Sequence, residues 1–165
     1  MNNLSSFIGL KNNFLKKENI YFFALVLIIF FSDRISKIKI LNEFNENTFY
    51  VNKYINLDLI WNTGIGFGFF SSTSPVFYNT VTGLIGIVIL YLIGLFLVSD
   101  YFDKLIFSII IGGACGNFYD RIIYKAVPDF IDLHYNTFHW FTFNIADVFI
   151  TIGILIYLFR GSLKK

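Results

Sequence analysis

The feature that most constrains the fold is a run of 41 consecutive residues, Leu59 to Ser99, without a single charged side chain. Only 15% of the whole chain is charged and 56% is hydrophobic, whereas an ordinary soluble domain has about 25% charged residues. A water-facing surface of normal polarity cannot be built from such a sequence, so the lipid bilayer is the expected solvent. At about 20 residues per membrane-crossing helix, the chain has room for four crossings and one small element outside the membrane.

The alternation of apolar and polar segments predicts an all-α membrane protein with four transmembrane helices. We expect the spans at residues 20–40, 76–99, 105–121 and 144–160, within a single polytopic domain of residues 1–165. The first apolar run follows several lysines, as a cleaved secretory signal would. The sequence FFSDRISK that follows offers no cleavage site between small residues, and the apolar pattern resumes at Ile35. We therefore expect the first span to remain uncleaved.

Residues 41–75 predict a small extracytoplasmic β element between the first two spans. Apolar Ile55, Leu57 and Leu59 alternate with polar Asn56 and Asp58, and glycines then occupy every second position from 64 to 68. Alternation with a period of two is typical of a strand that buries one face.

Four spans place both termini on one side of the membrane. Seven Lys and Arg residues fall on that side and six on the other, so the positive-inside rule favours cytoplasmic termini by a narrow margin. The segments after the first and third spans are then expected at the outer face.

Composition also excludes several function classes. A net charge of +2 with scattered basic residues is not a nucleic-acid-binding surface. The single cysteine, Cys115, cannot form an intrachain disulfide and is expected to be a small packing residue. The two histidines, His134 and His139, show no zinc-ligand spacing, so we expect no metal and no cofactor. We interpret both histidines, together with Trp140, as residues of the membrane interface.

Ionisable side chains gather where the predicted topology places the outer ends of the spans. Each costs roughly 2.5–3.5 kcal/mol at membrane depth and usually faces a polar cavity or the interior of a bundle. Together with the segment around Asn62, these ionisable side chains predict one polar site at one membrane face. The groups are Asp33, Arg34 and Lys37 toward the end of the first span, Asp120 and Arg121 at the end of the third, Asp129 and Asp132 in the next loop, and Asp147 in the first turn of the fourth.

Two carboxylates in a partly dry pocket share a proton, so that one activates water while the other polarises a carbonyl group. This aspartic-protease chemistry is open to Asp129, Asp132 and Asp147, and less so to Asp120, which the adjacent Arg121 can pair. Serine catalysis fits less well, because the chain has no G-x-S-x-G element and both histidines lie in one short loop.

Five sequence blocks follow one another along the chain: SDRISK at 32–37, NTGIGF at 62–67, GGACGNFYDR at 112–121, VPDF at 127–130 and FNIAD at 143–147. Together, and in this order, they resemble the lipoprotein signal peptidase (signal peptidase II) family. This family consists of four-helix aspartic proteases of the bacterial inner membrane. The resemblance implies removal of the signal peptide from prolipoproteins whose cysteine carries diacylglycerol, with cleavage just before that cysteine.

The resemblance also implies residue roles. The catalytic pair falls on Asp129 and Asp147. The sequence departs from the family pattern at two places: Arg34 stands where the family usually has Gln, and Ile65-Gly66 stands where two small residues are usual. Both departures bear on the shape of the implied pocket. The implied partners are lipid-modified prolipoproteins and membrane lipid, and we expect a monomer in the cytoplasmic (inner) membrane. Supporting and substrate-binding roles fall on Asn62, Gly64, Asn117, Arg121, Asn144, Asp33 and Lys37.

Other interpretations of these residues stay open at this point. Asp33 and Lys37 are four residues apart on one helix face, so they also fit a structural ion pair. Gly112 and Gly116 form a GxxxG pattern, whose expected role is close helix packing. The alternative functions are a small proton- or ion-coupled transporter subunit and a non-catalytic scaffold. A transporter would need ionisable groups through the membrane depth, and a scaffold leaves the clustered carboxylates and amides unexplained.

Overall fold

The computed structural model describes residues 17–43, 48–64 and 74–163. Ile65 and Gly66, which depart from the family pattern, lie outside the described residues. Four long helices account for most of the described chain, and each is long and apolar enough to cross a membrane. They are α2 (Lys17–Glu43), α3 (Pro75–Val98), α4 (Tyr101–Tyr124) and α5 (Ile145–Leu163). The predicted fold class, an all-α membrane protein with four transmembrane helices, is therefore confirmed.

The helix ends follow from local sequence. Ser74 caps α3 by accepting a hydrogen bond from the backbone of Phe77, and Pro75 occupies the first turn, where its missing N–H is no loss. Asp100 caps α4 in the same way through the backbone N–H of Asp103. Lys125 ends α4 with a left-handed backbone conformation, φ 57°.

Helix α4 is the centre of the bundle and packs against α2, α3 and α5. Its glycines permit the close approach. A Cβ atom at Gly113 would lie 2.6 Å from the carbonyl oxygen of Ala146 in α5, and one at Gly112 would lie 2.9 Å from the Cβ of Ile29 in α2. A Cβ at Gly116 would lie 2.5 Å from Oδ2 of Asp33 in α2, so both glycines of the GxxxG pattern, Gly112 and Gly116, have the packing role expected of them.

The predicted β element is confirmed as the hairpin of β1 (Phe49–Asn52) and β2 (Ile55–Asn62). A second hairpin, β3 (Val127–Tyr135) and β4 (Phe138–Phe143), joins it between α4 and α5, where the sequence had been interpreted as a loop. All neighbours are antiparallel in a four-stranded sheet of order β1-β2-β3-β4. Strand β3 lacks a clean period of two because residues on both of its faces are buried.

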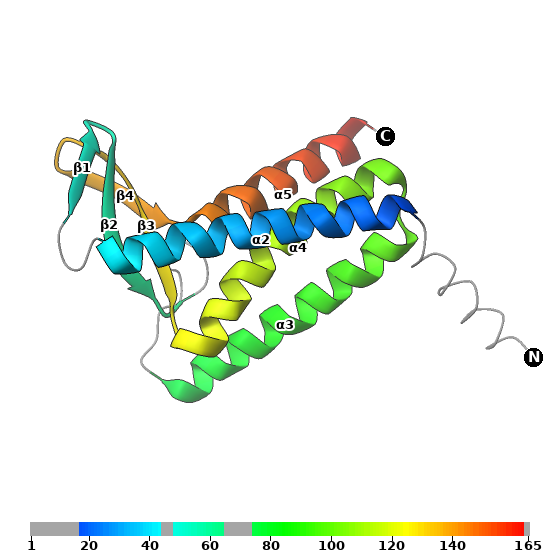
Figure 1. Cartoon of the computed structure of the whole chain (residues 1–165), viewed down its shortest axis with the longest axis horizontal. Coiled ribbons are helices and arrows are strands. Elements are labelled where there is room, and N and C mark those ends of the chain that lie inside the picture. The colour runs from blue at the N-terminus through cyan, green and yellow to red at the C-terminus, as the bar shows by residue number, and fades with distance from the viewer. Residues whose placement is uncertain (1–16, 44–47, 65–73, 164–165) are drawn as a thin grey trace, which may run out of the picture.

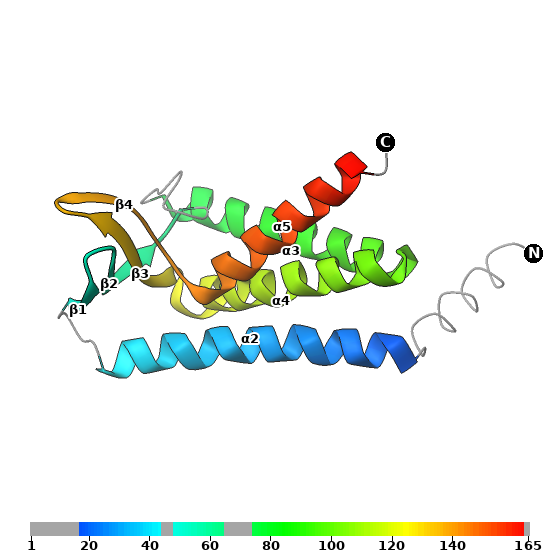
Figure 2. The same ribbon diagram turned by 90° about the horizontal axis from the view of Figure 1, so that it is seen from above.

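The sheet lies at one end of the helix bundle (Figures 1 and 2). The end of α2, the end of α4 and the beginning of α5 meet there, while the beginning of α2 and the end of α5 lie at the opposite end. Segments that the sequence predicted on one membrane face are therefore brought to one end of the molecule.

Candidate active site

The N-terminus of α5 brings the two predicted catalytic carboxylates together. Asn144 precedes the helix, and its Oδ1 accepts a 3.0 Å hydrogen bond from the backbone N–H of Asp147, while Oδ2 of Asp147 accepts one of 3.2 Å from the backbone N–H of Asn144. This reciprocal pair is a capping box, which fixes both side chains at the start of the helix. The remaining amide group of Asn144, Nδ2, donates a 2.6 Å hydrogen bond to Oδ1 of Asp129 in β3. One asparagine therefore connects the two aspartates.

The end of β2 provides the second contact with Asp129. Nδ2 of Asn62 donates a 2.8 Å hydrogen bond to Oδ2 of Asp129. The orientation of that amide is fixed because its Oδ1 accepts a 2.8 Å hydrogen bond from the backbone N–H of Gly64. Arg121 in turn donates to the carbonyl oxygen of Gly64, so the chain after β2 is attached to the end of α4.

Asn117 in α4 holds Asp147 by a hydrogen bond, and Lys37 in α2 in turn holds Asn117. Nδ2 of Asn117 donates a 2.8 Å hydrogen bond to Oδ1 of Asp147, and its Oδ1 accepts one of 2.8 Å from Lys37. The ammonium group of Lys37 also donates to Asp33 at 2.8 Å and to Asp120 at 2.7 Å, which uses all three of its protons. The side chains of Lys37, Asp33 and Asp120 are fully buried.

Asp33 contacts the first turn of α5 as well as pairing with Lys37. Its Oδ1 accepts a 3.0 Å hydrogen bond from the backbone N–H of Ala146, one of the free N–H groups in the first turn of α5. The other carboxylate oxygen lies against α4 at Gly116, where a Cβ would come within 2.5 Å of it. Asp33 and Lys37 therefore form the ion pair that their spacing suggested, and the same two side chains also contact residues around Asp147.

One expected ion pair is wrong. Asp120 does not pair with Arg121 but with Arg34 and Lys37. Neighbouring residues on an α-helix point about 100° apart, so Asp120 faces α2 while Arg121 faces the β2 side. The guanidinium of Arg121 lies 5.7 Å above the ring of Tyr78 in α3, whose hydroxyl donates a 3.2 Å hydrogen bond to the backbone carbonyl of Arg121. Sequence reasoning missed Tyr78, because nothing in the uncharged α3 segment distinguishes it.

Burial and a neighbouring negative charge both raise the pKa of Asp129, whose side chain lies outside the membrane spans. Removal from water and the neighbouring Asp147 carboxylate raise the pKa of Asp129 to about 7, against the opposing hydrogen bonds from Asn62 and Asn144. A carboxyl group with a pKa near neutrality is able to hold or release a proton at physiological pH.

Both aspartates line a cavity of about 290 Å³. Polar atoms of Asn62, Asn117 and Arg121 share its wall with the apolar side chains of Ile85, Ala114, Val127, Ile150 and Ile154. Asp147 also lines a second hollow of about 240 Å³, together with Leu133, Phe141, Phe143, Val148, Thr151 and Ile152. Asp147 thus borders two largely apolar hollows, whereas Asp129 borders the first.

The third candidate carboxylate, Asp132, is not part of this cavity. It lies three residues after Asp129 on β3, and its Oδ2 contacts Nδ1 of His139 at 2.8 Å and Nδ1 of His134 at 3.6 Å. The interpretation of His134 as an interface residue is wrong, because it is 94% buried and faces Asp132. The histidine spacing gave no metal signal in the sequence, yet these three residues are the group in the described chain that has the donors for a metal ion.

Comparison with known proteins gives consistent matches over nearly the whole chain. The family model described as signal peptidase (SPase) II matches residues 25–162. The chain is 47% identical to a protein of Pelagibacter ubique named lipoprotein signal peptidase, covering 95% of both chains. It is 38% identical to one of the same name from Dichelobacter nodosus, covering 83% of this chain and 90% of that one. A solved structure described as a bacterial membrane enzyme, determined in meso at 2.3 Å resolution, superposes with a TM-score of 0.71 at 28% identity, over 88% of this chain and 91% of the other.

Proposed function

This chain belongs to the signal peptidase II family, and from that premise we propose that it is an aspartic endopeptidase acting on lipid-modified prolipoproteins. Membership makes it a multi-pass bacterial membrane protease that removes signal peptides. The proposal adds the catalytic groups, the chemical state of the substrate and the position of the cut.

The observation that carries the proposal is that Asp129 and Asp147 line one cavity and are connected through Asn144. Two carboxylates in such a place hold one shared proton. The ionised member accepts a proton from a water molecule, which attacks the scissile carbonyl carbon. The protonated member donates to the carbonyl oxygen, and the resulting tetrahedral intermediate breaks down when the leaving amine is protonated.

The supporting side chains give this pair its geometry. Asn62 and Asn144 donate to different oxygens of Asp129, and Asn117 donates to Asp147, so neither carboxylate is free to rotate. Preorganised hydrogen bonds of this kind keep reacting groups in position without any movement during the reaction. Arg121, which also lines the cavity, is placed to contact carbonyl groups of a bound substrate backbone.

The substrate class follows from the walls of the cavity. We propose that the signal peptide and the acyl chains of a diacylglyceryl-cysteine occupy the apolar surfaces beside Asp147, with the bond before that cysteine over the aspartate pair. A lipid-modified membrane helix would reach these surfaces laterally from the bilayer. The pair is expected near the outer face of the cytoplasmic (inner) membrane, with both termini in the cytoplasm.

The second, third and fourth spans argue against the transporter alternative. Helix α3 has no charged residue at all. The charged residues of α4 lie near its two ends, at Asp103 and Lys104 and at Asp120 and Arg121, and those of α5 lie in its first and last turns. A proton or cation path would require ionisable groups along the depth of the membrane.

The central test replaces each aspartate with its neutral isostere. We expect Asp129→Asn and Asp147→Asn to lower cleavage of a diacylglyceryl-modified precursor at least a thousandfold, about the combined effect of losing water activation and carbonyl polarisation. The matched control is Asp58→Asn in β2, which changes a carboxylate of the same sheet outside the cavity and is expected to retain full activity. Near-normal cleavage by either catalytic variant would refute the assignment.

A second test addresses recognition of the lipid. Buried acyl chains contribute about 0.8 kcal/mol per CH₂ group, and the bound chains would position the scissile bond. We therefore expect the purified protein to cleave a lipidated precursor and to leave the same precursor without diacylglycerol uncut. Equal rates on both would contradict the substrate proposal while leaving the aspartate assignment intact.

A further inference from the structure

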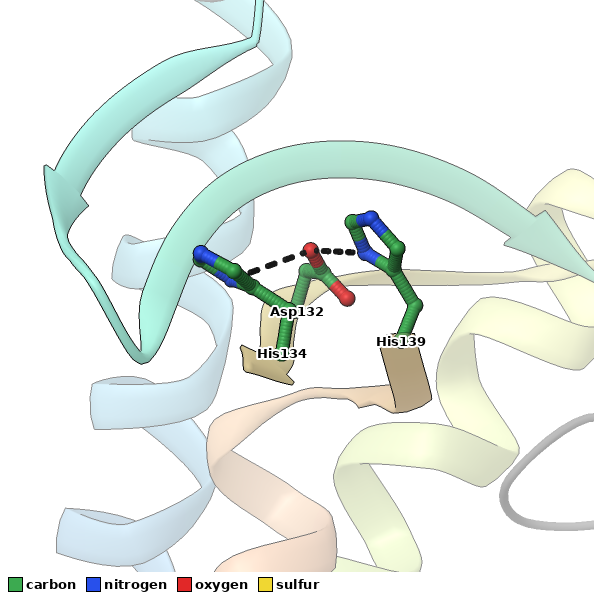
Figure 3. A group of neighbouring side chains, drawn as sticks. All are labelled: Asp132, His134 and His139. Atoms are coloured by element: carbon green, nitrogen blue, oxygen red, sulfur yellow. Dashed lines mark hydrogen bonds and ion pairs between the residues drawn. The ribbon is translucent and has the colours of Figure 1, made fainter. Parts of the chain in front are cut away.

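A second group of polar side chains lies on the β3–β4 hairpin, away from the cavity of the aspartate pair. It consists of Asp132 and His134 in β3 and His139 in β4 (Figure 3). Asp132 and His134 are two residues apart, so they point to the same face of the sheet. One donor atom from each of the three residues lies within 4.8 Å of the other two.

An irregularity in the strand pairing places His139 in this group. Leu133 pairs with Phe141, but His134 pairs with His139, so Trp140 is an extra residue in β4. Regular pairing would have set His139 opposite Tyr135 and on the other face. The β-bulge therefore turns the His139 side chain toward Asp132 and His134.

Hydrogen bonds within the hairpin do not satisfy all the polar atoms of these three side chains. A hydrogen bond between Asp132 and His139 satisfies those two residues, but Nδ1 of His134 is buried with no hydrogen-bond partner among the described residues. Oδ1 of Asn56 is a second such atom. Asn56 is the register partner of Asp132 in β2, so its side chain leaves the sheet on the same face. Buried polar atoms without partners are uncommon in native proteins, and a bound ion or an ordered water is what usually satisfies them.

We propose that Asp132, His134 and His139 bind one divalent transition-metal ion of the zinc class, with Asn56 or water completing the coordination. Two ligand atoms about 2.0–2.1 Å from a tetrahedral zinc ion lie roughly 3.4 Å apart. Oδ2 of Asp132 is already 3.6 Å from Nδ1 of His134 and 2.8 Å from Nδ1 of His139. The rings of His134 and His139 are stacked, with centroids 5.4 Å apart and planes at 26°, so the His139 ring must turn as it moves outward to bind the same ion. That side chain is free to do so because it is 57% exposed.

The ligand set selects the class of metal. Imidazole nitrogens favour zinc and the later first-row ions, whereas Mg²⁺ and Ca²⁺ require mostly oxygen ligands. His139 gives the ion a route from solvent, and His134 holds it on the buried side. A bound ion joins β3 to β4 across the bulge and stabilises the strand that carries Asp129, three residues from Asp132.

Metal binding is measured on the full chain, purified in detergent and stripped with a chelator. We expect wild type to bind one Zn²⁺ per chain in competition with a chromophoric chelator, and to bind Co²⁺ with the visible absorption of a four-coordinate nitrogen and oxygen site. His139→Ala, an exposed change that leaves the fold intact, and His134→Asn should each weaken Zn²⁺ at least tenfold. Zn²⁺ should raise the Tm of wild type but not of the variants, and Mg²⁺ should raise neither.

Two variants serve as controls for zinc bound elsewhere. Asp58→Asn alters another carboxylate of the same sheet, and Cys115→Ala removes the only thiol, so both should retain the full Zn²⁺ stoichiometry. The proposal is overturned by the absence of binding at micromolar Zn²⁺, by unchanged affinity in His139→Ala, or by loss of binding in Cys115→Ala. Because every readout is metal binding or Tm, the result is independent of the proposed protease chemistry.

Discussion

At the scale of single residues, the site depends on side chains that each make several contacts. Asn144 caps α5, fixes Asp147 and donates to Asp129, while Lys37 connects Asn117, Asp33 and Asp120. A buried polar group that loses its partner costs about 1–3 kcal/mol, so the loss of one such side chain affects several others. Residues of this kind behave as a unit, and the effects of their substitution are not additive.

The raised pKa of Asp129 predicts the pH dependence of cleavage. Below a pH of about 7 the aspartate pair retains its shared proton, and above it the proton is lost, so kcat/KM should fall on the alkaline side with an apparent pKa near 7. The Asn62 amide favours the ionised form of Asp129. Asn62→Ala should therefore shift the alkaline limb to higher pH, as well as lowering the rate.

A pH–rate profile of the two proteins checks this prediction. Asp58→Asn, whose carboxylate lies outside the cavity, is the control and should keep the wild-type profile. A limb that stays in place or shifts to lower pH in Asn62→Ala would show that Asp129 does not control it.

At the scale of elements, the packing of α4 against α5 sets the position of Asp147. Gly113 in α4 touches the backbone of Ala146, which is next to Asp147, so there is no flexible side chain to give way. Gly116, one helical turn later, makes room for the carboxylate of Asp33. The small residues at 112–116 of α4 therefore allow the helices to pack closely and also set the geometry of the site.

Gly113→Ala tests this contact. The added Cβ would lie 2.6 Å from a backbone oxygen, so the helices must separate, and we expect a loss of about 1–3 kcal/mol in stability together with reduced cleavage. Gly94→Ala in α3 is the matched control, since a Cβ there meets nothing within 4 Å. That change should leave Tm unchanged or raise it, because Ala favours a helix over Gly by about 1 kcal/mol. Equal Tm changes in the two variants would contradict the packing argument.

At the scale of the whole molecule, the bundle has two different ends. The sheet and the aspartate cavity lie at one end, and the beginning of α2 and the end of α5 lie at the other (Figure 1). Helix α3 has only three buried residues, Tyr78, Val81 and Ile89, so most of its apolar surface faces outward, as expected for contact with lipid. The long axis of the bundle is therefore expected to cross the membrane.

Cysteine labelling tests this orientation. In a Cys115→Ala background, new cysteines at Lys53 and Thr137, in the turns of the two hairpins, should react with an impermeant reagent added outside intact cells. Cysteines at Tyr101 and Ser162, near the opposite end, should react only after permeabilisation. Labelling of Lys53→Cys and Thr137→Cys from opposite sides would be incompatible with one sheet on one membrane face.

The sequence by itself determined the solvent of this protein, its four spans and its polar residues. An uncharged run of 41 residues leaves no alternative to lipid, and ionisable groups gathered toward one end of the spans predict where a polar site must be. It also predicted a β element in residues 41–75, because apolar Ile55, Leu57 and Leu59 alternate with polar Asn56 and Asp58 in the segment that forms β2. The five motif blocks predicted Asp129 and Asp147 as the catalytic pair, and both residues line one cavity.

Only the tertiary structure decided which residues face one another. The partners of Asp120, the role of Tyr78 and the second hairpin depend on contacts between segments far apart in sequence, and the periodicity of one segment contains no information about its neighbours. The position of His139 depends on a single extra residue in β4, and a bulge of this kind changes the face of a strand without any change in its sequence pattern. A motif fixes the chemical groups of a site, but their geometry is a property of the packed molecule.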